Sequence, residues 1–115
     1  MAKSFYAVMI RWDILPTEAK VSEIDATLGV LGDWLRFGGH NWLIWSESTP
    51  SQIYAALAGK LSQKDSELIV NFDPNSYSGW APKWVDDWIT QRRDGALKVI
   101  SPPSPSFASL FEPKP

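Results

Sequence analysis

The sequence predicts an α+β sandwich in which an antiparallel sheet carries helices on one face. Short runs of apolar and aromatic residues alternate with stretches whose apolar residues recur every three or four positions, and turn-forming residues separate the two. Strands joined by such crossover helices form a sheet with the helices packed against it. The chain of 115 residues, 44% of them hydrophobic, has the size of one domain with one core.

The first part of the chain predicts a strand followed by a helix. Residues 4–14 are rich in aromatic and apolar side chains and end before Pro16, which is typical of a strand. From Thr17 onward the apolar residues fall three and four apart, as on one side of a helix, and Gly32 is a suitable stop. The apolar stripe consists of Val21, Ile24, Leu28 and Leu31.

The middle of the chain predicts two more strands with a helix between them. Residues 41–46 follow a glycine turn and are apolar almost without a break. Thr49 then supplies a helix N-cap, and Gln52 is its capping-box partner. Residues 66–72 form the third predicted strand, which the turn-forming residues 73–75 end.

The next segment predicts a short helix and a weak strand. Pro82 suits the start of the helix, and residues 96–100 are the expected last strand. Tryptophans fall four residues apart around this helix, and they are Trp80, Trp84 and Trp88. Exposed aromatic residues can stack on the bases of single strands, but such platforms come with a basic groove, which this sequence lacks. The spacing therefore favours a core or interface stripe.

Residues 101–115 are rich in proline and serine, so we expect a mobile tail after a domain that spans residues 1–100. The tail also contains Phe107, Leu110 and Phe111, which could dock onto a protein partner. A tail without a function is the alternative.

Composition excludes several classes of protein. Without cysteine the chain has no disulfide and no thiolate metal site, and with one histidine a classical zinc site would need mostly carboxylate ligands. No P-loop, dinucleotide-binding, zinc-protease or serine-hydrolase motif is present. The net charge of −2 and the scattered basic residues do not indicate a dedicated nucleic-acid binder. The N-terminal apolar run is too short for a signal peptide, and no run approaches the ~20 residues of a membrane helix, so a cytoplasmic protein is expected.

The predicted strands are apolar on both sides, which has a consequence for assembly. In the first strand both alternating sets of side chains are largely apolar, whereas a sheet covered by helices on one face needs one apolar side. Something must therefore cover the second face. We expect a homodimer formed through that face, and the alternative is coverage by the third helix and the tail of the same chain.

Asp13 is the first candidate for a functional residue. It follows Arg11 at the end of the first predicted strand with the same side-chain parity, on the face expected to meet a two-fold partner. Two copies of Asp13 could then approach each other, and paired carboxylates are hard ligands for Mg²⁺ or Mn²⁺. The structural alternative is that Asp13 caps the turn into the first helix or pairs with Arg11.

His40 is the second candidate. It lies in the flexible turn Gly38-Gly39-His40-Asn41, where an imidazole could act as a general base. The alternative is a solvated surface histidine.

A resemblance adds to these predictions, and it covers about three quarters of the chain. Its residues are Asp13, Leu31-Gly32-Asp33-Trp34, Trp42-Leu43-Ile44, Thr49, Ile53, Asp65, Leu68-Ile69-Val70, Tyr77, Gly79-Trp80, Pro82-Lys83 and Trp88. On these residues the chain resembles a family of small bacterial proteins called SinR-like. That family is distantly similar to the CRISPR-associated protein 2 superfamily, which includes endoribonucleases of the virulence-associated D type.

The resemblance implies a ferredoxin-like fold, a symmetric homodimer, and divalent-metal-dependent cleavage of RNA or DNA that depends on a strand-end aspartate, here Asp13. The leading hypothesis is therefore a metal-dependent ribonuclease or nuclease, in which Arg11 or Arg36 balances the phosphate charge. The rival hypothesis is a non-catalytic interaction or assembly module, such as a toxin-antitoxin or phage-defence component. The acidic composition favours this rival.

Overall fold

The computed structural model of the chain describes residues 2–38 and 40–94. The chain divides into two compact units, Met1–Asp73 and Pro74–Pro115. The first unit contains six of the seven elements, and the second contains the last helix. In chain order the elements are β1 (Ser4–Arg11), α1 (Glu18–Leu31), β2 (Gly32–Phe37), β3 (Asn41–Ser46), α2 (Pro50–Ala58), β4 (Ser66–Phe72) and α3 (Lys83–Arg93).

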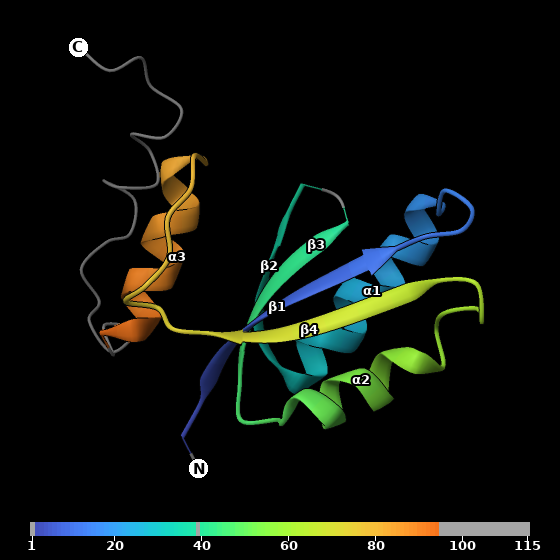
Figure 1. Ribbon diagram of the computed structural model, residues 1–115, viewed down its shortest axis with the longest axis horizontal. Helices are drawn as coiled ribbons and strands as arrows, with labels where there is room; N and C mark the ends of the chain where they lie inside the picture. The colour runs from blue at the N-terminus through green and yellow to red at the C-terminus, as the bar shows by residue number, and fades with distance from the viewer. Residues whose placement is uncertain (1, 39, 95–115) are drawn as a thin grey trace. The chain divides into compact units, whose positions relative to one another are not determined.

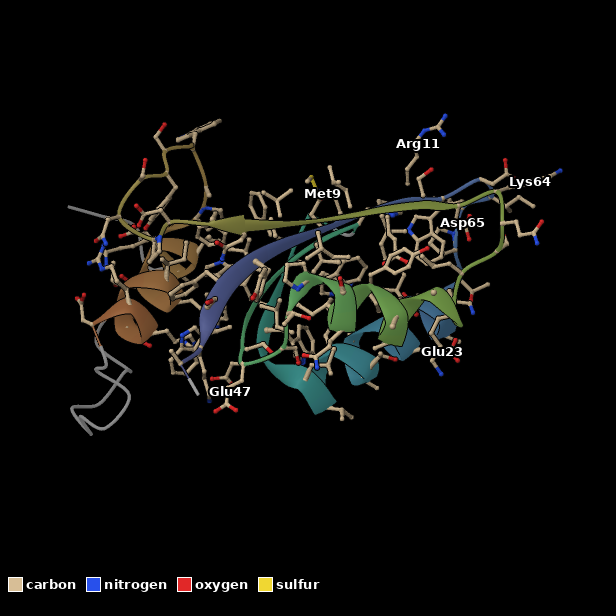
Figure 2. All side chains as sticks on the ribbon, turned by 60° about the horizontal axis from the view of Figure 1, so that its bottom comes forward. Met9, Arg11, Glu23, Glu47, Lys64 and Asp65 are labelled. Atoms are coloured by element: carbon tan, nitrogen blue, oxygen red, sulfur yellow. The ribbon has the colours of Figure 1, made fainter. Side chains whose placement is uncertain are left out.

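The four strands of the first unit form one sheet in the order β2-β3-β1-β4, and every neighbouring pair is antiparallel. Both α1 and α2 lie on the same face of this sheet (Figures 1 and 2). This is the ferredoxin-like arrangement of strand, helix, two strands, helix and strand. The predicted α+β fold, with an antiparallel sheet and helices on one face, is confirmed.

The core lies between the helices and the face of the sheet that they cover. Alternate residues of β1 point into it, and the apolar stripe predicted for α1 and the apolar side of α2 supply the other side. The buried residues of this core are Tyr6, Val8, Ile10, Ile24, Leu28, Trp42, Ile44, Ile53 and Leu57.

Helix caps fix the start of both helices at the predicted positions. The Thr17 side chain accepts a hydrogen bond from the backbone N–H of Lys20, and Thr49 and Gln52 form both hydrogen bonds of a capping box. The loop between β1 and α1 is therefore anchored where the helix begins.

One predicted boundary was wrong, and one strand was not predicted. The first strand ends at Arg11 and not at residue 14, because residues 12–17 form the loop into α1. Gly32 ends α1 as predicted but also begins β2, a strand that the sequence reasoning left out. The strand predicted for residues 96–100, the tail at 101–115 and the domain boundary at 100 lie outside the described residues.

The face of the sheet opposite the helices, called here the open face, also carries apolar side chains. The strand register aligns Phe37, Asn41, Met9 and Leu68 in one row across the four strands. We call these four residues the outer row. Toward the other end of the face, the ring of Phe5 packs against those of Trp45 and Phe72, with ring centroids 6.4 and 5.5 Å away. The predicted second apolar side therefore exists.

The second unit contains α3, which begins after Pro82 as predicted. Its buried residues are Val85 and Ile89, while Trp80 precedes the helix and is fully exposed. The sequence predicts a core or interface stripe for Trp80, Trp84 and Trp88; the full exposure of Trp80 rules out a core position for this residue, and the interface alternative stays a prediction.

Candidate functional site

Two loops meet beside the end of β1 and form a groove of about 530 Å³. One loop connects β1 to α1 and the other connects α2 to β4, and the groove between them is lined by polar and apolar side chains. The lining residues that matter below are Trp12, Asp13, Lys20, Lys60, Ser62 and Asp65. Asp13 is exposed, so its carboxylate is accessible from solvent.

Asp65 connects the two loops. Its Oδ1 accepts a hydrogen bond from the backbone N–H of Asp13 at 2.8 Å, and its Oδ2 accepts one from the backbone N–H of Ser62 at 2.9 Å. The bond from Asp13 is the main reason why the pKa of the Asp65 carboxyl is lowered, and the bond from Ser62 adds to it. The position of Asp13 therefore depends on a carboxylate 52 residues further along the chain.

The two lysines of the groove are tied to the carboxylate of Glu23 on α1. Lys20 Nζ lies 3.0 Å from a Glu23 oxygen and donates to the carbonyl oxygen of Lys60 at 3.0 Å, and Lys60 Nζ lies 3.6 Å from Glu23. The hydrogen bond from Lys20 is the main cause of the lowered pKa of Glu23. These contacts anchor α1 to the end of α2, and Glu23 offsets part of the lysine charge.

The two arginines considered for phosphate binding lie in different surroundings. Arg11 is exposed, and it extends with Met9 from the open face (Figure 2). Arg36 Nε lies 3.4 Å from an Asp25 oxygen, and the same oxygen accepts the indole N–H of Trp42 at 2.7 Å. Arg36 therefore contacts Asp25 on the helix-covered side of the sheet. Arg11 instead lies exposed on the side where the partner copy is predicted, and could contact a phosphate there.

His40 is not brought into the groove. It lies in the turn between β2 and β3, where its carbonyl oxygen accepts the backbone N–H of Ile10 at 3.2 Å. Its side chain is half-buried, and among the described residues its Nδ1 has no hydrogen-bond partner. The structure thus places His40 on the β3 side of β1, while the groove lies on the β4 side.

Asp13 lies two residues beyond the end of β1 and belongs to the loop. It lines the groove beside the α2–β4 loop and does not continue the ladder of the open face. Its exposed carboxylate has the hard oxygen atoms that Mg²⁺ and Mn²⁺ prefer as ligands, so Asp13 could be one of the several ligands that such an ion needs. Within residues 2–38 and 40–94, no three acidic, histidine or cysteine side chains cluster as a metal site.

The sequence marked neither of two carboxylates in and beside the site, Asp65 and Glu67, as functional. Asp65 follows the turn at residues 63–64, and its bond to Ser62 agrees with a role in that turn. Its second bond, to Asp13, joins residues that are 52 positions apart in the sequence, so no local sequence pattern could predict this bond. The adjacent strand residue Glu67 was also missed: burial raises the pKa of its carboxyl, and its Oε1 has no partner among the described residues.

Comparison of the chain with protein-family models, with curated proteins and with solved structures found no match. The family resemblance noted above therefore stays a prediction. No helix in the described part of the chain combines the length and apolar character needed to cross a membrane.

Proposed function

We propose that the chain forms a homodimer through the open face and acts as a divalent-metal-dependent ribonuclease at the paired ends of β1. The chemistry is assigned to Asp13, and the assembly to the outer row. The proposal joins the resemblance to three features of the fold: an exposed carboxylate, a neighbouring exposed arginine and an uncovered apolar surface.

The outer row is the observation that carries the proposal. Its three apolar members retain considerable exposure, 36% for Met9, 38% for Phe37 and 58% for Leu68, and Val70 beside them is 40% exposed. Burying such side chains against a second copy is favourable, and a two-fold interface repeats every contact. Arg11 follows Met9 by two residues on the same strand face, so a two-fold axis near the outer row brings both strand ends together.

Each residue then has a defined task. Asp13 of each copy supplies an oxygen ligand, and Arg11 balances the negative charge of the RNA phosphate. A Mg²⁺ or Mn²⁺ ion held by Asp13 would supply Lewis-acid chemistry at this position. Asp65 holds the loop that carries Asp13. His40 has no assigned step, because it lies outside the groove.

Cleavage of a labelled single-stranded RNA in the presence of Mn²⁺ or Mg²⁺ tests the proposal. We expect Asp13→Asn to lose cleavage at least a hundredfold while the dimer is retained, because the amide removes the charged ligand and preserves the shape. Glu47→Gln is the matched control, since it removes one exposed carboxylate at the opposite end of the unit (Figure 2). Cleavage that survives Asp13→Asn removes Asp13 from the mechanism.

A non-catalytic assembly module is the second candidate, and one observation favours it. Ile14 and Leu15 are 78% and 79% exposed on the loop that carries Asp13, so a second apolar surface borders the groove. Exposed apolar neighbours of this kind suit protein contacts better than RNA contacts. Under this candidate, Ile14→Ser with Leu15→Ser abolishes capture of a protein partner, and Asp13→Asn changes nothing.

A further inference from the structure

We infer that a second groove, between α2 and the edge strand β4, binds an alkylammonium ion with Glu67 as its ionic partner. This groove has a volume of about 470 Å³, within the range of small-molecule sites, and is called here the α2 groove. Binding there requires neither Asp13 nor the homodimer. The residues that line the α2 groove are Tyr54, Ala58, Leu61, Ser62, Gln63, Asp65, Ser66 and Glu67.

The Glu67 carboxyl is the unusual group of the α2 groove. Its side chain lies on the helix-covered side of the sheet, because Ile69, two residues further along β4, packs against the core. Its Oε1 is buried and has no hydrogen-bond partner among the described residues. Burial alone raises the pKa of this carboxyl, with no contribution from a neighbouring charge or donor. A buried acceptor without a partner destabilises the fold, and a ligand that donates to it relieves this cost.

The charge of the α2 groove favours a cation. Two carboxylates line it, Asp65 and Glu67, and none of its described lining residues is basic. Lys64, which belongs to the same loop, extends outward at the end of the unit (Figure 2). Both oxygens of Asp65 already accept backbone N–H groups, so Glu67 is the carboxylate that a ligand can pair with.

One available carboxylate beside apolar side chains suits an organic cation and does not suit a metal ion. Divalent ions need several oxygen ligands, and in the described part of the chain no three acidic, histidine or cysteine side chains cluster. An ammonium group has three donors, of which one can reach Glu67 and another the side-chain oxygen of Gln63. The alkyl chain then contacts Leu61, and the half-exposed ring of Tyr54 offers its face to the positive charge.

The test is titration of the ¹⁵N-labelled full chain with butylammonium chloride at neutral pH, followed through the backbone amide shifts of residues 62–67. We expect saturable shifts for the wild type. Glu67→Gln keeps the size of the side chain and removes its charge, so the affinity should weaken about ten- to hundredfold. Glu47→Gln is the matched control, because it removes an exposed carboxylate at the opposite end of the unit, and should bind like the wild type (Figure 2). Butanol has the same alkyl chain without the charge and should give no saturable shifts.

Two further comparisons define the ligand. Tyr54 is 54% exposed, so its replacement leaves the core intact; Tyr54→Ala should weaken binding about two- to fivefold, whereas Tyr54→Phe retains the ring and the affinity. The amide of Nα-acetyl-lysine carries the same ammonium group as butylammonium. Tighter binding of the lysine derivative assigns the α2 groove to a lysine side chain of a protein, and tighter binding of butylammonium assigns it to a free amine.

Protection of the sheet edge is the structural alternative for Glu67. The strand β4 lies at the edge of the sheet, and an inward-pointing charge on an edge strand discourages pairing with another chain. Under this alternative Glu67→Gln self-associates in sedimentation equilibrium, and butylammonium leaves the amides of residues 62–67 unshifted. A wild type without saturable shifts, or equal affinities of the wild type and Glu67→Gln for butylammonium, overturns the inferred site.

Discussion

Replacing Leu68 by alanine is expected to weaken the homodimer about 30- to 100-fold. Leu68 belongs to the outer row and is 58% exposed in the single chain. Burying a whole leucine side chain contributes about 1.5–3 kcal/mol, so covering the exposed part contributes about 1–1.5 kcal/mol in each copy. A two-fold interface contains the residue twice, so the dimer loses about 2–3 kcal/mol, which gives the expected change in Kd.

Sedimentation equilibrium over a range of protein concentrations measures this change directly. Val30→Ala is the matched control, because Val30 is 86% exposed but lies on α1, away from the open face. We expect the control to dimerise like the wild type. Equal dissociation constants for Leu68→Ala and Val30→Ala, or a wild-type monomer at micromolar concentration, contradict dimerisation through the outer row.

Three further changes test the fold beneath the site, each by urea unfolding. Gly32→Ala is expected to destabilise the chain by more than about 2 kcal/mol, because the added Cβ would lie 2.3 Å from a backbone oxygen of β3, whereas Gly59→Ala meets open space and should be near neutral. Ser46→Ala should cost about 1–3 kcal/mol, since the buried hydroxyl donates to a carbonyl oxygen at 2.7 Å and accepts a backbone N–H at 2.9 Å. For Glu67, burial raises the pKa of the carboxyl, so the folded state binds a proton more readily than the unfolded state. The free energy of unfolding therefore falls as the pH rises from the ordinary pKa of glutamate through the raised pKa of Glu67. Glu67→Gln should remove this pH dependence and stabilise the chain at pH 7; a loss of stability there would contradict it.

The fold could be predicted because its signals are local and repeated. The stripe of α1, the cap at Thr49 and the alternation in β1 each depend on residues a few positions apart, and the structure confirms all of them. The two apolar sides of β1 also predicted a second apolar face of the sheet, and the outer row lies on that face. These patterns agree with one another, and such agreement identifies a fold.

Two features could not be predicted, for different reasons. The strand β2 follows α1 without a loop, and Gly32 serves both elements, so the usual stop signal concealed the start of a strand. The bond between Asp13 and Asp65 depends on β1 and β4 being neighbours in the sheet, which is a property of the topology. The surroundings of Asp13 therefore became visible only with the strand order.

The distance between labelled ends of two copies tests most directly whether the β1 ends meet. The chain contains no cysteine, so Lys64→Cys and Glu47→Cys each introduce one site for a nitroxide label. Lys64 lies beside the groove and Glu47 at the far end of the unit (Figure 2). With the two-fold axis near Leu68, the first residues of β4, which begins at Ser66, and the two loop residues before it separate Lys64 from the axis by at most ~13 Å.

Pulsed dipolar EPR of each labelled dimer then gives two distances to compare. We expect the Lys64 labels to lie about 30 Å apart, which is roughly twice the distance of each label from the two-fold axis. The Glu47 labels should lie clearly farther apart. A longer distance for the Lys64 pair than for the Glu47 pair, or no dipolar coupling in either, would contradict a site built from two β1 ends.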